Sequence, residues 1–194
     1  MLTTSEDRLN AASLAYVNGS FERAKELLDN LIDEPSYPYS IGARYLRARG
    51  LEDGVFSGTP DLNAALLDFS IVREHMNDYG SDGALGCARV LYLLDGHGNR
   101  DQIILLCNEA IDRDRNVKAM MILGKAYEEL IDDKATSRMW YLRAFRRGLP
   151  WGMQFYARSH YGEGNLVRAA VGYMAAAVAR PFLILKYGNR SPFK

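Results

Sequence analysis

The chain has 194 residues, of which 48% are hydrophobic and 25% charged, and its formal net charge is zero. These values are typical of a soluble folded protein and exclude the disordered and fibrous classes, while the length fits one ordinary domain or about five stacked helical repeats. No apolar run reaches the roughly 18 residues that a membrane span needs, and the polar, acidic N-terminus does not resemble a secretory signal peptide, so we expect a cytoplasmic protein.

Acidic and basic residues are distributed unevenly along the chain. Residues 1–114 contain 19 acidic and 10 basic residues, whereas residues 115–194 contain 5 acidic and 14 basic residues, so the two parts carry −9 and +9. Such a dipole could orient an approaching partner or favour head-to-tail self-association. Two ordinary solvated faces would produce the same pattern.

The first clear element is an amphipathic helix that begins after Ser20, a residue placed to cap its N-terminus. The spacing puts Ala24, Leu27, Leu28 and Leu31 on one face of this helix. Similar segments follow, separated by short stretches that contain Gly or Pro, and no run alternates apolar and polar residues as a strand would. We therefore expect about ten helices of ordinary length.

A period of 33 residues relates the helices nearer the C-terminus. Gly96 and Gly98 recur two periods later as Gly162 and Gly164. The same register aligns Val90, Leu123 and Tyr156; Leu91, Gly124 and Ala157; Cys107, Trp140 and Tyr173; and Ile111, Ala144 and Ala177. A period between 20 and 50 residues indicates a stacked array, in which each unit is one helix pair.

These positions resemble a known family. The stretch Ala119-x-x-x-Leu123-Gly124-x-x-Tyr127, followed by Trp140-Tyr141-x-x-Ala144-x-x-x-Gly148, is similar to the Sel1-like subclass of tetratricopeptide repeats. A looser copy follows over residues 152–181, and weaker copies precede it, the first resembling an ordinary tetratricopeptide unit. The resemblance implies an all-α fold, a right-handed α-α superhelix (solenoid) of about five helix-turn-helix repeats over residues 1–181.

Two departures from the family pattern stand out. Residues 129–132 lack the Gly-x-Gly turn of the family, and Arg89 follows Ala88 where small residues are usual. We therefore expect irregular stacking of the second and third units.

The sequence offers no set of residues for catalysis, and we predict no enzyme, no cofactor and no metal site. The two cysteines and three histidines lack zinc-ligand spacing, and Cys87 and Cys107 are expected to be buried thiols in a reducing compartment. The segment 96–101 is no P-loop, and His160 takes a repeat position filled elsewhere by Tyr127 and Leu94, which indicates a packing role.

The resemblance places the first helix of each pair along a concave groove that binds a partner segment. By repeat register, the residues expected to face this groove are Tyr92, Lys118, Lys125, Glu128, Trp151, Gln154, Arg158 and Tyr161. Lys125 and Arg158 share one repeat position, so they would lie side by side and could grip a partner's carboxylate. Exposed basic residues without such a role are also common.

The expected role is a protein-interaction scaffold or adaptor. The alternative is a membrane-proximal accessory subunit of an envelope or secretion assembly, docked through its basic C-terminal half, and a third possibility is an enzyme with a scattered site. A basic stripe at Arg138, Arg143, Arg146 and Arg147 has no accompanying nucleic-acid motif, so nucleic acid is not expected as a partner. Residues 182–194 form a basic, apolar tail that could cap the fold, mediate a dimer or contact a membrane.

Overall fold

The computed structural model describes residues 4–34, 38–75 and 78–187, except for the side chains of Asp78 and of residues 183–187. This part of the chain contains ten helices and no strand. In chain order they are α1 (Ser5–Val17), α2 (Phe21–Ile32), α3 (Tyr39–Glu52), α4 (Leu62–Glu74), α5 (Asp78–Asp95), α6 (Arg100–Asp114), α7 (Val117–Glu129), α8 (Lys134–Arg146), α9 (Trp151–Gly162) and α10 (Leu166–Tyr187). The predicted all-α repeat fold is confirmed.

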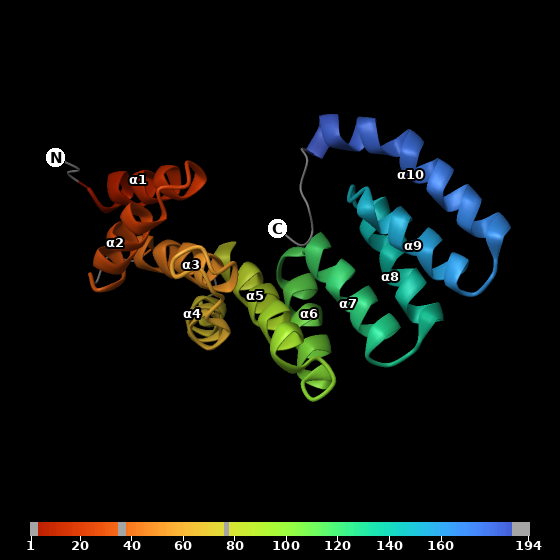
Figure 1. Cartoon of the computed structure of the whole chain (residues 1–194), viewed down its shortest axis with the longest axis horizontal. Helices are drawn as coiled ribbons and strands as arrows, with labels where there is room; N and C mark the ends of the chain where they lie inside the picture. Colours follow the sequence, from red (N-terminus) through yellow and green to blue (C-terminus); the bar gives the residue numbers. More distant parts are fainter. Residues whose placement is uncertain (1–3, 35–37, 76–77, 188–194) are drawn as a thin grey trace. The chain divides into compact units, whose positions relative to one another are not determined.

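The helices divide between two compact units, residues 1–95 and 96–194. Unit 1 contains α1 to α5, and unit 2 contains α6 to α10 (Figure 1). Helices that follow one another within a unit pack together, as expected when each helix covers the apolar stripe of its neighbour.

The amphipathic helix predicted after Ser20 is α2. Ala24, Leu27, Leu28 and Leu31 are all buried, and they form a core cluster with residues of α1 and α3. Ser20 occupies the N-cap position, but its side chain makes no capping hydrogen bond. Burial of the apolar face therefore holds α2 in place without help from that cap.

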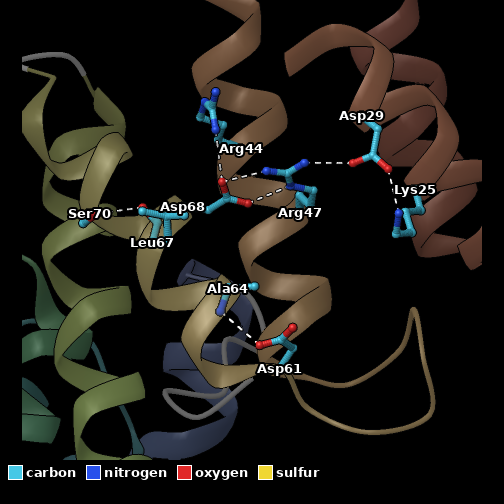
Figure 2. A network of polar contacts seen from close by, with 9 residues as sticks. All are labelled: Lys25, Asp29, Arg44, Arg47, Asp61, Ala64, Leu67, Asp68 and Ser70. Carbon is cyan, nitrogen blue, oxygen red and sulfur yellow. Dashed lines mark hydrogen bonds and ion pairs between the residues drawn. The ribbon is translucent and has the colours of Figure 1, made fainter. Parts of the chain in front are cut away.

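A polar network joins α2, α3 and α4 in unit 1 (Figure 2). Asp68 of α4 is 1% exposed and accepts hydrogen bonds from Nε and Nη2 of Arg47, at 2.7 and 2.9 Å, and from Nη1 of Arg44, at 3.2 Å. Arg47 also donates to Asp29 of α2 at 2.9 Å, and Lys25 bonds the same carboxylate. Each buried charge thus has opposite charges around it, as burial requires.

A second charged pair explains the residue that departs from the family pattern. Arg89 of α5 donates from Nε to Glu52 of α3 at 2.6 Å, and both side chains are largely buried. The Arg89 guanidinium also lies over the ring of Phe69, 5.6 Å from its centroid. The Arg89 side chain can be buried here because the Glu52 carboxylate pairs with its charge and the Phe69 ring packs against its guanidinium.

In unit 2 the first helices keep the predicted 33-residue register. Gly124 of α7 and Ala157 of α9 are both buried, and both lie against the following helix. A Cβ atom on Gly124 would lie 2.6 Å from the Tyr141 ring, and one on Gly172 of α10 would lie 2.8 Å from the Ala157 Cβ. Small residues at these positions let the helices approach closely.

The second helices follow a different register. The residues that precede α6, α8 and α10 are Asn99, Asp133 and Asn165, so the spacings are 34 and 32 residues. The buried Ser137 and Ala144 of α8 therefore correspond to the buried Ala169 and Ala176 of α10. The predicted alignment of Trp140 with Tyr173 and of Ala144 with Ala177 is wrong by one residue, and Ala177 is exposed.

The turn between α7 and α8 replaces glycine with aspartate. Asp132 has φ 61°, in the left-handed region, and Gly164 has φ 75° at the corresponding place before α10. Aspartate tolerates this conformation better than most side chains. The missing Gly-x-Gly sequence therefore does not prevent a tight turn.

Helix α10 continues through Pro181 to Tyr187. Proline removes the backbone N–H that would otherwise bond the carbonyl of Ala177, yet the helix is not ended there. Position 181 therefore lies inside a helix, while residues 188–194 lie outside the described residues. The capping or docking role of residues 182–194 stays a prediction.

Candidate partner-binding surface

The eight predicted groove residues lie on three first helices of the pairs. Tyr92 is on α5 in unit 1, and the other seven are in unit 2. Helix α7 carries Lys118, Lys125 and Glu128, and helix α9 carries Trp151, Gln154, Arg158 and Tyr161. Four of them, Lys125, Glu128, Arg158 and Tyr161, form what we call the α7/α9 face.

Glu128 links three helices. It accepts a hydrogen bond from the hydroxyl of the fully buried Tyr141 of α8 at 2.7 Å, and Nη2 of Arg158 lies 3.7 Å from the same carboxylate oxygen. Burial, together with the bond to Glu128, raises the pKa of Tyr141 far above its ordinary value, so its hydroxyl keeps its proton. Glu128 therefore joins α8 to α7 and makes a longer, more exposed contact with Arg158 of α9.

Lys125 and Arg158 converge on one carboxylate, as the shared repeat position predicts. Lys125 Nζ is 3.6 Å from Glu129 Oε2, and Arg158 Nη2 is 3.9 Å from Glu129 Oε1. A partner's carboxylate would therefore meet these cations in competition with Glu129. The Glu129 side chain is 40% exposed, and ion pairs at such distances on an exposed surface contribute little to stability.

Trp151 contributes to the packing of the fold. It is half-buried against a core cluster that includes Met120 and Leu149, and the Arg180 guanidinium of α10 lies over its ring, 4.8 Å from the centroid. The positive charge of Arg180 is attracted to the electron-rich face of the Trp151 indole. Trp151 thus joins the start of α9 to α10.

Arg158 and Tyr161 are the exposed members of the candidate set. The Arg158 side chain is 53% exposed and lies over the Phe155 ring, 4.6 Å from the centroid, and Tyr161 is 62% exposed. Three residues apart on one helix, they share a face of α9. Tyr92, Lys118 and Gln154 are half-buried.

Two buried titratable groups of unit 2 are held in their neutral forms. His160 is buried, its Nδ1 has no hydrogen-bond partner among the described residues, and its ring stacks edge-on against Tyr156. Burial lowers the pKa of His160, and the charges of Arg138 and Arg168 lower it further, so the ring is neutral at pH 7. Burial also raises the pKa of the Cys107 thiol to about 12.

The described residues form neither a metal-ligand cluster nor a membrane-spanning helix. Among them, no group of three or more His, Cys, Asp and Glu side chains is placed to hold a metal ion. Within the same ranges, each helix is too short or too polar to cross a membrane.

Sequence reasoning missed the two contacts that organise this surface. Tyr141 belongs to the motif that resembles the Sel1-like family, but its hydroxyl bond to Glu128 has no signature in the helical pattern. The Arg180 contact with Trp151 joins residues 29 positions apart, across the α9–α10 turn. A fixed repeat register cannot predict it, because α10 begins one residue early.

Comparison with known proteins supports the fold. No family model matches the chain, and none of the curated proteins matches it in sequence. A crystal structure of MamA is similar with a TM-score of 0.66 at 13% identity, covering 91% of this chain and 97% of that chain. A second crystal structure of MamA gives a TM-score of 0.64 at 14% identity, covering 96% and 97%. MamA is a helical repeat protein of the tetratricopeptide type, and this chain shares that helical repeat fold.

Proposed function

We propose that this chain is a non-enzymatic scaffold or adaptor of the tetratricopeptide or Sel1-like type, which binds a segment of a partner protein on its α7/α9 face. The observation that carries the proposal is the pair Arg158 and Tyr161, exposed together on α9. Arginine and tyrosine are the side chains that most often dominate the binding energy of protein interfaces.

The support beneath these two residues favours binding. The Tyr141–Glu128 hydrogen bond and the stacking of Arg158 on Phe155 fix the helices and the guanidinium before a partner arrives. A surface that is already ordered loses less conformational entropy on binding. The helical repeat fold shared with MamA is consistent with a protein partner.

The chemistry of the face indicates the kind of segment it would take. An acidic side chain could replace Glu129 beside Arg158 and Lys125, and an apolar or aromatic side chain could cover Tyr161. We therefore expect a protein segment that combines an acidic residue with an apolar one.

Site-specific photo-crosslinking in the native host tests this proposal. A photoreactive phenylalanine derivative at Tyr161 is expected to capture one protein partner, and Arg158→Ala in the same chain is expected to reduce that crosslink strongly. The matched control places the probe at Met139, which is 41% exposed on α8. Equal capture at both positions, or capture at 161 that Arg158→Ala leaves unchanged, would contradict the proposal.

A further inference from the structure

Over residues 166–182, the large apolar side chains of α10 lie on the solvent side. Among residues 166–182 of α10 (Figure 1), the buried ones are Ala169, Gly172 and Ala176. A Cβ atom on Gly172 would lie 2.8 Å from the Cβ of Ala157 in α9, so this side of α10 packs closely on α9. The exposed residues instead include Val167 at 76%, Val171 at 56%, Met174 at 62%, Val178 at 67% and Phe182 at 69%. We call these five residues the outer stripe.

The corresponding face of the other second helices is more polar. Using the spacings of 34 and 32 residues, the four positions from Val167 to Val178 correspond to Asp101, Leu105, Asn108 and Asp112 in α6 and to Ala135, Met139, Leu142 and Arg146 in α8. The face thus carries two carboxylates in α6, one cation in α8 and no polar group in α10. Of these three helices α10 alone has a fully apolar surface on this side, and an exposed apolar surface of this kind indicates contact with another molecule.

The area of this surface suits a stable interface. The outer stripe alone exposes on the order of 600 Å² of mostly apolar surface, about three quarters of the roughly 800 Å² that each partner buries in a typical complex. Scattered exposed apolar residues are common on proteins, but a continuous patch of this size is not.

The spacing within the outer stripe favours another helix as the occupant. Its members follow one another at intervals of four, three, four and four residues, which is close to the 4-3 alternation of residues at helix–helix seams. Ala170 and Ala177 lie beside the stripe and are small enough to let two helix axes approach. We propose that α10 pairs along its outer stripe with α10 of a second copy of this chain, in antiparallel orientation.

Charge sets the orientation of the pair. Arg168 is exposed at the edge of the stripe, next to Val167, and the sequence has no acidic residue after Glu163 that could neutralise it across the seam. Parallel helices would place the two Arg168 side chains together. Antiparallel helices that cross at Met174 separate them by about 18 Å along the axis. Each Arg168 then lies level with Arg180 of the other copy, but the Arg180 guanidinium lies over Trp151 on the α9 side of the helix, so the repulsion across the seam is relieved.

Sedimentation of the full chain tests the pairing. The wild-type chain is expected to show a concentration-dependent dimer, and Val171→Glu is expected to weaken it at least about 30-fold by placing a carboxylate in the seam. The matched control is Leu105→Glu, at the same repeat position of α6 and 62% exposed, which is expected to leave the dimer unchanged. Circular dichroism checks that both variants keep their helices.

Single cysteines test the orientation. Met174→Cys is expected to form an intermolecular disulfide under mild oxidation, because the two copies meet there, whereas Val167→Cys is not, because its two copies lie about 21 Å apart along the axis. The chain's own Cys87 and Cys107 are buried. Equal crosslinking at 167 and 174 would overturn the antiparallel arrangement.

Other occupants of the stripe give different results. A wild-type chain that stays monomeric at high concentration overturns the proposal, as does a dimer that Val171→Glu leaves intact. Flotation with vesicles of phosphatidylcholine and phosphatidylserine addresses a lipid surface: a monomer that floats with them, and loses this on Val171→Glu, assigns the stripe to lipid and overturns the pairing. The proposal uses residues outside the α7/α9 face, so Tyr161→Ala is expected to leave the dimer unchanged.

Discussion

The two units join their helices by different chemistry. In unit 1 the contacts between helices include buried charges: Arg44 and Arg47 of α3 hold Asp68 of α4, and Arg89 of α5 holds Glu52 of α3. In unit 2 the corresponding contacts place an aromatic ring against glycine, with Tyr141 packed on Gly124. We therefore expect the stability of unit 1 to be most sensitive to loss of a buried charge, and the stability of unit 2 to be most sensitive to a change of side-chain volume.

The net charges follow the same division. Unit 1 has 15 acidic and 8 basic residues, a net charge of −7, and unit 2 has 9 acidic and 16 basic residues, a net charge of +7. The candidate surface and the outer stripe of α10 both belong to the basic unit. Both proposed surfaces thus lie where the net charge is positive, and this charge would favour an acidic partner at the α7/α9 face.

The largest effect is expected from Asp68→Ala in unit 1. The substitution leaves the Arg47 and Arg44 charges, each about a quarter exposed, without their main partner, and is expected to lower the free energy of unfolding by about 3 kcal/mol. Urea denaturation measures the change. Asp112→Ala, at an exposed position of α6, is the control and should change stability by less than about 0.5 kcal/mol.

Gly124→Ala is the volume test in unit 2. The added Cβ would lie 2.6 Å from the buried Tyr141 ring, so we expect a loss of about 1 to 3 kcal/mol despite the better helix propensity of alanine. Gly162→Ala is the matched control, because no atom lies within 4 Å of the Cβ atom that it adds. If both variants unfold at the same urea concentration as the wild type, close packing at Gly124 is not important.

Tyr141→Phe isolates the hydroxyl from the ring. It removes the 2.7 Å bond to Glu128 and is expected to cost about 1 to 2 kcal/mol, since Glu128 retains only its longer contact with Arg158. Combining it with Glu128→Gln in a double-mutant cycle measures the coupling directly. Additive effects would show that the bond contributes nothing beyond packing.

The smallest effect concerns pH. The pKa of His160 is lowered in the folded state, so the unfolded chain takes up this proton first as the pH falls, and stability is lost below the ordinary histidine pKa. Unfolding curves at pH 7.5 and 5.5 are expected to differ less for His160→Leu than for the wild type. If the stability of His160→Leu depends more steeply on pH than that of the wild type, folding does not lower the pKa of His160.

The sequence predicted the helix pairs well because each one depends on local spacing. Small residues such as Gly124 and Ala157 recur where helices touch, so the first helices of unit 2 follow the predicted register. The second helices do not follow that register, because the turns before them differ in length by one residue. A change of one residue turns every later side chain of the helix by about 100° relative to the prediction. That single shift is why the exposure of α10 could not be predicted.

The buried charges of unit 1 were missed for a related reason. Asp68 is the only charged residue between Leu62 and Val72, and a lone carboxylate in such an apolar helix is a usable signal of a buried ion pair. Its partner Arg47 lies on another helix, and periodicity does not indicate which helix that is. For the candidate surface, the register predicted which helices carry it, but exposure alone distinguishes Arg158 and Tyr161 from the packed Trp151.

The most direct test of the scaffold function is the affinity for the segment captured at position 161, measured by titration calorimetry. The double variant Arg158→Ala with Tyr161→Ala is expected to bind at least about 30-fold more weakly than the wild type, with unchanged thermal stability. Arg146→Ala, which removes an exposed arginine of α8, should bind like the wild type. If the double variant retains wild-type affinity, the α7/α9 face is not the binding surface.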